Sequence, residues 1–118
     1  MEYSLISAKV FNLTMEGAPR EDEKNSLTVT NELMLNSEKS SELFVKSIVE
    51  AKLSSGMNIE LDYIFYFQFK GEYTEKEIEE KFDRKVLVSI TYPYIRSFIS
   101  SFSGLAGYEF VNLPMVKF

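Results

Sequence analysis

The sequence predicts an α+β fold in which a four-stranded antiparallel sheet is followed by a short helix and one long helix. Two observations support this fold class. Residues 3–69 contain four segments with the two-residue periodicity of strands, joined by polar connections. Residues 74–107 then change to helical spacing. The chain has 118 residues, about the length of one domain, so residues 1–118 are expected to form a single domain.

The first strand is expected over residues 3–15, and both of its faces are partly apolar. One alternating set is Leu5, Ser7, Lys9, Phe11, Leu13 and Met15, and the other is Ile6, Ala8 and Val10. This pattern indicates a strand that is covered on both faces. Residues 16–26 then gather Gly, Pro and charged residues, which predicts an exposed loop.

The next three strands alternate more clearly. Residues 27–35 place Leu and Val on one face and Thr and Glu on the other, as in a half-buried strand. Residues 37–41 predict a turn, and residues 43–53 alternate in the same way. After a second turn, the last strand places six apolar residues on one face, namely Ile59, Leu61, Tyr63, Phe65, Phe67 and Phe69. Ile64 and Tyr66 make the middle of its other face apolar too.

A capping box predicts the short helix. Thr74 is followed three residues later by Glu77, a pair that satisfies two backbone donors at a helix start. The helix is expected over about residues 75–82, and its charges are interpreted as a solvated surface.

A stripe of apolar residues predicts the long helix. It should begin between Val86 and Tyr92, with Pro93 in the first turn or at a kink, because proline cannot donate a backbone hydrogen bond. Gly104 and Gly107 should mark its end. The stripe consists of Ile95, Phe98, Ile99, Phe102 and Leu105.

The opposite face of this helix carries serines where a surface helix usually carries charges. These residues are Ser97, Ser100, Ser101 and Ser103. Small side chains let another helix or sheet approach closely, so Ser97, Ser100 and Ser101 are candidate oligomer-interface residues, together with Phe11 of the first strand. The alternative is that the serines face water.

The composition argues against an enzyme. The chain has no Cys and no His, which removes thiolate nucleophiles, Cys-based zinc sites and the commonest neutral-pH base. It also lacks phosphate-binding glycine loops and a nucleophile elbow, so we expect no catalytic residue, metal or cofactor.

The charge and the N-terminus bound the partners and the compartment. The net charge of −5 argues against nucleic acid as a partner. The N-terminus does not read as a signal peptide, and no run of apolar residues is long enough to span a membrane. We therefore expect a cytoplasmic protein without membrane insertion.

Residues 92–118, YPYIRSFISSFSGLAGYEFVNLPMVKF, resemble the C-terminal core of the SecB family of protein-export chaperones. In that family an aromatic-Pro-Tyr-x-Arg segment opens a long helix, and an Asn-Leu-Pro-x-x-x-Phe segment follows it. The matching residues are Tyr92, Pro93, Tyr94, Arg96, Asn112, Leu113, Pro114 and Phe118. The resemblance implies helices on one face of the sheet, dimers paired through sheet edges, and tetramers formed through the long helix.

The resemblance also implies a function. SecB-like proteins are ATP-independent holdase chaperones that bind non-native polypeptides in apolar grooves of an oligomer and, in export, deliver preproteins to SecA. Several apolar residues exceed what one small core needs, and such a surplus indicates a binding surface or an interface. The candidate client-binding residues are Ile64, Tyr66, Phe110, Leu113, Met115 and Phe118.

A second function is compatible with the same resemblance. Export chaperones continue into a further helix and a tail that contacts SecA, whereas this chain ends at Phe118. Shorter SecB-like proteins include chaperones that protect an antitoxin, and phage or Gram-positive relatives. The alternative is therefore a dedicated interaction protein with one partner, such as an antitoxin, and fold alone does not separate the two functions.

Overall fold

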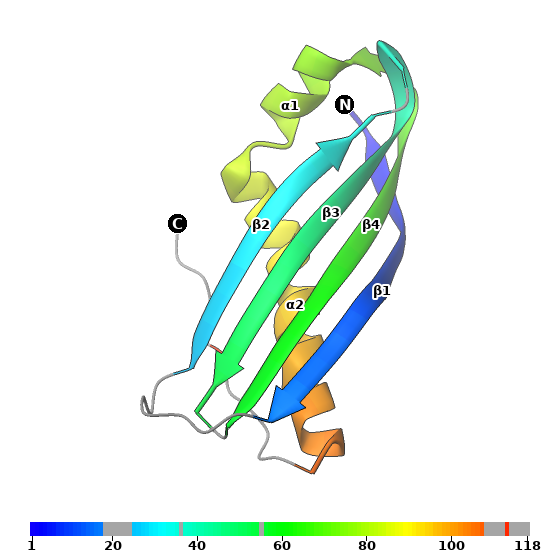
Figure 1. The fold of residues 1–118 in the computed structure, drawn as a ribbon. Helices are drawn as coiled ribbons and strands as arrows, with labels where there is room; N and C mark the ends of the chain where they lie inside the picture. Colours follow the sequence, from blue (N-terminus) through cyan, green and yellow to red (C-terminus); the bar gives the residue numbers. More distant parts are fainter. Residues whose placement is uncertain (18–24, 36, 55, 108–112, 114–118) are drawn as a thin grey trace.

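Four strands and two helices form the fold in the computed structural model, which describes residues 1–17, 25–35, 37–54, 56–107 and 113 (Figure 1). In chain order the elements are β1 (Tyr3–Gly17), β2 (Ser26–Met34), β3 (Lys39–Leu53), β4 (Met57–Thr74), α1 (Glu75–Lys81) and α2 (Arg84–Leu105). All neighbouring strands pair antiparallel, in the spatial order β1-β4-β3-β2, so β1 and β2 are the two edges of the sheet. The predicted fold class is confirmed.

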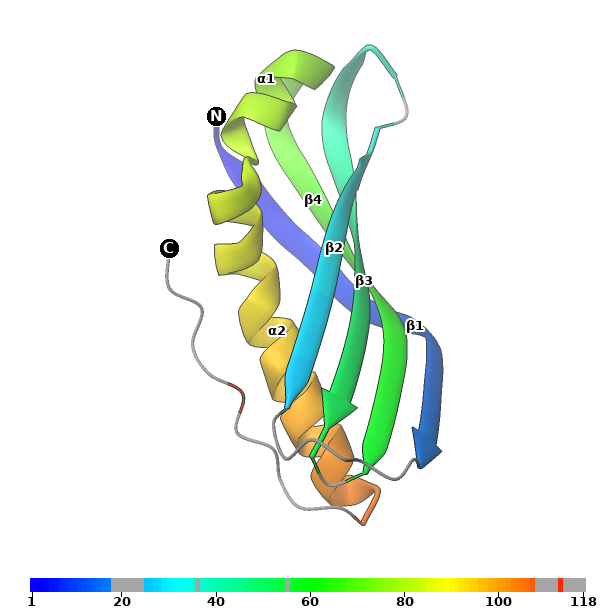
Figure 2. The same cartoon turned by 60° about the vertical axis from the view of Figure 1, so that its left-hand side comes forward.

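Both helices lie on the same face of the sheet (Figure 2). The sheet therefore has one helix-covered face and one helix-free face. The alternation predicted for the central strands is present. In β4 the six apolar residues that share one face are all buried and face the helices, namely Ile59, Leu61, Tyr63, Phe65, Phe67 and Phe69. In β3 the buried apolar residues alternate likewise, and β3 itself begins at Lys39, inside the segment expected to be a turn.

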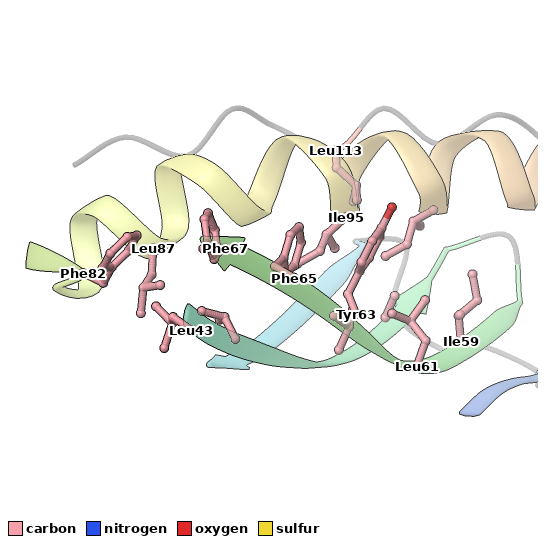
Figure 3. Close-up of a cluster of buried hydrophobic side chains, with 14 of the residues drawn as sticks. Leu43, Ile59, Leu61, Tyr63, Phe65, Phe67, Phe82, Leu87, Ile95 and Leu113 are labelled. Atoms are coloured by element: carbon pink, nitrogen blue, oxygen red, sulfur yellow. The ribbon is translucent and has the colours of Figure 1, made fainter. Parts of the chain in front are cut away.

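The core lies between the central strands and the helices. Tyr63, Phe65 and Phe67 point from β4 toward α2 (Figure 3). The ring of Phe67 lies 5.4 Å from that of Phe82, at the junction of α1 and α2, and the rings of Tyr63 and Phe65 stack at 4.9 Å. Full burial of side chains of this size contributes about 1.5–3 kcal/mol each.

The predicted capping box is present at the start of α1. The backbone N–H of Glu77 donates to Thr74 Oγ1, and the backbone N–H of Thr74 donates to Glu77 Oε1. Ile78 is the residue of α1 that is buried.

Helix α2 begins earlier than expected. Asp83 is its N-cap and accepts a hydrogen bond from the backbone N–H of Val86 at 3.0 Å, so the helix starts at Arg84 rather than between residues 86 and 92. Pro93 consequently lies inside the helix and not in its first turn. Pro93 is exposed, so water can satisfy the carbonyl that its ring leaves without a donor. Gly107 has a φ of +93° just after the C-cap, as a closing glycine should.

The buried stripe of α2 is rotated from the predicted one. It runs at intervals of four residues through Leu87, Thr91, Ile95, Ile99 and Ser103. Phe98 and Phe102 lie about 100° to one side and are half-buried. Leu105 lies about 200° beyond Ser103 and is 85% exposed, so its placement in the stripe was wrong. Ser103, expected on the outer face, is buried.

Strand β1 also differs from its prediction. A strand covered on both faces was expected, but β1 is an edge strand, and all of its residues are exposed or half-buried. The reason is that its helix-free face has no second layer and its outer edge has no paired strand among the described residues.

Candidate functional site

Apolar side chains that are exposed or half-buried form three groups on the described surface, and the first follows β1. Its members are Tyr3, Ile6, Phe11, Leu13 and Met15, which are between 37% and 51% exposed. Five such residues on one edge strand are more than scattered surface exposure accounts for.

Two irregularities fix the geometry of β1. Its pairing with β4 shifts register between Leu5 and Ser7 and again between Phe11 and Thr14. Within the second shift, Asn12 has a φ of +53° and its Nδ2 donates to Asp62 Oδ2 at 2.8 Å. Bulges of this kind bend a strand and re-aim its side chains. The pairing of β1 with β4 is therefore divided into three regular stretches, residues 3–5, 7–11 and 14–17.

The second group lies in the middle of the helix-free face. Met34, Phe44 and Tyr66 are opposite one another on β2, β3 and β4, and the rings of Phe44 and Tyr66 stack at 4.7 Å. Ile48, Ile64 and Phe11 share this face, because their cross-strand partners do. We call these six residues the sheet patch: Phe11, Met34, Phe44, Ile48, Ile64 and Tyr66.

Polar contacts hold the sheet patch in place. The hydroxyl of Tyr66 donates to Glu42 Oε2 at 2.7 Å and accepts from Gln68 Nε2 at 3.0 Å. Lys46 Nζ lies 3.9 Å from Asp62 Oδ2, so the cation beside Ile64 has a counter-charge. Satisfied polar groups around exposed apolar side chains are typical of a surface that contacts a partner.

The third group is an aromatic row on α2. The ring of Tyr94 lies edge-on to Phe65 at 5.6 Å, and that of Phe98 lies edge-on to Tyr63 at 6.2 Å. Phe98 in turn stacks on Phe102 at 5.6 Å. Burial, and secondarily the neighbouring Tyr94, raises the pKa of Tyr63, so its phenol stays neutral at physiological pH.

The described residues were also compared with the requirements of a metal site and of a membrane-spanning helix. In the ranges given above, no group of three or more Asp, Glu, Cys or His residues could hold a metal ion. No helix in the described part of the chain is long and apolar enough to cross a membrane. The three apolar groups offer surface for contact with other apolar side chains.

The structure places the predicted client-binding residues in different environments. Ile64 and Tyr66 lie half-buried in the sheet patch. Leu113 is 3% exposed and belongs to the core, with its side chain directed at α2 (Figure 3), so it is buried rather than exposed. Packing against the core removes the apolar side chain of Leu113 from water, which is energetically favourable. Phe110, Met115 and Phe118 lie outside the described residues.

The interface and motif residues are also distributed. Phe11 is exposed on β1, Ser97 and Ser101 are exposed on α2, and Ser100 is half-buried there. Of the motif, Tyr92 and Arg96 are half-buried, whereas Pro93 and Tyr94 are exposed. Burial raises the pKa of Tyr92, and Arg96 opposes that shift. Asn112 and Pro114 lie outside the described residues.

Sequence reasoning missed several members of the three groups. In β2 and β3 the apolar residues Met34, Phe44 and Ile48 occupy the positions that alternate with buried or half-buried residues. Apolar residues at these alternate positions are the sequence signal of a patch on the helix-free face. Phe98 and Phe102 were assigned to the core stripe, but they lie at its side, half-buried and packed against the core.

Comparison with known proteins identifies the fold. No known family profile matches the chain, and no curated protein sequence matches it. Among solved structures, the chain is similar to the SecB-like chaperone Rv1957 of Mycobacterium tuberculosis in complex with a ChAD peptide from the Rv1956 HigA1 antitoxin. The TM-score is 0.78 and the sequence identity 11%, over 98% of this chain and 88% of that one. The chain therefore has a SecB-like fold.

Proposed function

We propose that this chain, which has a SecB-like fold, is an ATP-independent holdase chaperone that binds non-native polypeptides through apolar surface on a homo-oligomer. The observation that carries the proposal is the amount of apolar side chain left exposed on both β1 and the helix-free face. A small domain that functions alone would bury more of it, because each Å² of exposed apolar area costs about 25 cal/mol.

Sequestration needs no catalytic residue. A protein that binds unfolded chains in preference to native ones lowers the concentration of free unfolded chain by mass action. The sheet patch supplies two kinds of contact, namely flat stacked rings at Phe44 and Tyr66 and branched aliphatic side chains at Ile48 and Ile64. Phe110, Met115 and Phe118 remain candidate contributors.

Self-association through β1 is the assembly that we propose. Its five exposed apolar residues lie toward the two ends of the strand, with Ser7, Ala8, Lys9 and Val10 between them. In an antiparallel pair of β1 strands, the apolar residues at the start of one copy would therefore lie beside those at the end of the other copy. The exposed Ser97 and Ser101 and the half-buried Ser100 would let a second α2 approach closely.

A dedicated interaction with one partner is the second candidate. The observation that favours it is the similar solved structure, which contains a SecB-like chaperone with a peptide of an antitoxin. On this proposal the same apolar surface would recognise one segment of one protein, and SecA delivery of exported proteins would not be involved. A dedicated protein should discriminate sharply among peptides, whereas a holdase should not.

Light scattering of two unrelated denatured proteins tests the holdase proposal. The purified chain should suppress aggregation of both proteins without ATP. Tyr66→Lys should weaken suppression several-fold, because it removes a stacked ring and places a charge in the sheet patch. Lysine can still pair with Glu42, so the fold should survive.

Thr30→Lys is the matched control, because Thr30 is exposed on the same face opposite Ile48 but is not an apolar member of the patch. It should leave suppression nearly unchanged. Unchanged aggregation curves with both denatured proteins, combined with tight binding of a single partner peptide, would reject the holdase and favour the dedicated interaction.

A further inference from the structure

The sulfur of this chain is all in methionine side chains. The sequence has five methionines and no cysteine, so an oxidant can act on sulfur only at a thioether. Among the described residues, Met57 is fully buried at the start of β4, whereas Met1 is 39% exposed. Met15 on β1 and Met34 on β2 are 42% and 37% exposed. The chain therefore contains buried and accessible thioethers that can be compared directly.

Met34 is also a member of the sheet patch. It lies opposite Phe44 in the ladder between β2 and β3, and the ring of Phe44 stacks on that of Tyr66 at 4.7 Å. Directly opposed side chains of an antiparallel pair are neighbours on the same face of the sheet. A thioether beside aromatic rings is a favourable and adaptable contact in an apolar surface. Met34 therefore contributes to the patch and is open to a small oxidant at the same time.

The surroundings of Met34 offer little compensation for a polar group at its sulfur. A sulfoxide is polar, and its oxygen accepts hydrogen bonds. Phe44 has no side-chain donor, and Glu32, two residues earlier on the same face of β2, is only an acceptor when ionised. Lys46, diagonal to Met34, lies 3.9 Å from Asp62. A client that covered an oxidised Met34 would therefore desolvate an oxygen to which neither Phe44 nor Glu32 donates, and this opposes binding.

We propose that Met34 is an oxidation site at which hydrogen peroxide weakens client binding by the sheet patch, an inference that rests on the proposed chaperone function. The sulfur of Met34 donates a lone pair to one oxygen of the peroxide, so an S–O bond forms as the O–O bond breaks. The proton of the transferred hydroxyl passes to the departing hydroxide, which leaves as water. Sulfur loses two electrons and the peroxide gains them, so the products are methionine sulfoxide and water. Methionine sulfoxide reductases reverse the change, which makes it a switch.

Peptide mass mapping of the purified full chain after a timed exposure to hydrogen peroxide tests the site. Met34 and Met15 should each gain one oxygen at similar rates, because their exposed fractions are similar. Met57 should react at least about tenfold more slowly, since its sulfur is reached only when the fold opens. A Met34 that stays unmodified while Met15 is oxidised, or that reacts no faster than Met57, would overturn the assignment.

Aggregation suppression tests the switch with a matched pair of variants. Met15→Leu keeps Met34, and the double variant Met15→Leu with Met34→Leu lacks it, so the remaining methionines are common to both. Catalase removes the peroxide before a denatured protein is added, and each variant is compared with its own untreated sample. Oxidised Met15→Leu should need about fivefold more chain for half-maximal suppression, whereas the double variant should change by less than about twofold. Reductases that act on both sulfoxide epimers should reverse the loss.

The outcomes separate this inference from the proposed function. An equal loss of suppression in both variants, or no loss in either, would overturn the switch and leave the holdase intact. A loss that the reductases do not reverse would overturn it as well. Circular dichroism of oxidised Met15→Leu is the control for folding, because a loss of suppression caused by unfolding would also count against the switch. An untreated chain that suppresses no aggregation would reject the proposed function, and the switch with it.

Discussion

The two edges of the sheet are built on the same pair of central strands, yet they differ in almost every physical respect. β1 has two register shifts, a residue with positive φ and five exposed apolar side chains. β2 has an uninterrupted ladder and a regular alternation of half-buried and exposed residues. A bulged apolar edge accepts only a partner of matching shape, whereas a regular edge accepts an extended chain in several registers.

This difference makes the two edges suited to different kinds of partner. An irregular strand fits best against another strand with the same irregularities, which a second copy of the chain supplies. A regular edge strand binds mainly through main-chain hydrogen bonds, and every polypeptide can supply these. Substitutions in the central strands, on each edge and at the start of α1 should separate the two edges experimentally.

Phe65→Ala should have the largest effect, and it should reach both edges. Phe65 is fully buried on β4, opposite Ala8 of β1 and Val45 of β3. Lost burial and the remaining cavity should lower the free energy of unfolding by about 3–5 kcal/mol. Urea denaturation measures the loss. Amide protection should fall in β1 and β2 together, and a loss confined to β1 would show that the edges are not parts of one cooperative unit.

Phe11→Lys should weaken self-association without unfolding the chain. Phe11 is 45% exposed on β1, and a lysine there can pair with Asp62, which lies opposite. In an oligomer paired through β1 the added charge would be desolvated, which should raise the dissociation constant by about 100-fold. Sedimentation over a dilution series measures it.

Thr30→Lys is the control for this prediction, because it places the same charge on the β2 edge strand. It should leave the dissociation constant within a few-fold of the unmodified chain. Equal weakening by both variants would mean that self-association is not specific to β1.

The central part of the fold could be predicted from local pattern alone. Along β4, apolar residues at every second position determine which face is buried, and the capping box at Thr74 specifies where α1 begins. These signals depend on residues adjacent in sequence, and the structure confirms them.

The edges and the orientation of α2 depend on contacts that the sequence does not display. Position within a sheet is set by which strands pair, so the apolar pattern of β1 could not distinguish a covered strand from an edge. Asp83 stands within a charged run, which obscured its role as N-cap of α2. Which of the adjacent apolar rows of α2 is buried depends on how the helix packs on the sheet. Among the proposed site residues, Ile64 and Tyr66 were predicted from alternation, and the structure places them half-buried on the helix-free face.

Asn12→Val should have an intermediate effect that is confined to β1. A β-branched residue strains at a φ of +53°, and the hydrogen bond to Asp62 is lost, so stability should fall by about 2 kcal/mol. Asn12→Gly tolerates this φ and should lose only about 1 kcal/mol from the missing bond. Thr30→Val on β2 should change stability by less than about 0.5 kcal/mol. Thermal unfolding compares the stability of the three variants. Equal losses of stability for Asn12→Val and Asn12→Gly would show that backbone strain at position 12 makes no contribution.

Thr74→Ala should have the smallest effect, and it should disturb one edge only. Replacing the N-cap of α1 should cost about 1 kcal/mol, measured by urea denaturation. The C-cap of α1 is Phe82, whose ring lies 5.0 Å from that of Tyr3 on β1, so loosening α1 should raise amide exchange at the start of β1 and leave β2 unchanged.

The capping box also gives this last effect a pH dependence. Hydrogen bonds from the backbone and side chain of Thr74 hold the pKa of Glu77 below its usual value. A carboxylate with a lowered folded-state pKa stabilises the fold above its unfolded pKa, and this contribution is lost as pH falls through the folded pKa. The difference between the unmodified chain and Thr74→Ala should therefore be largest at neutral pH and shrink below about pH 4. A difference that is constant with pH would show that Glu77 does not take part. Slower amide exchange in β2 than in β1, in both the unmodified chain and Thr74→Ala, would still distinguish the two edges.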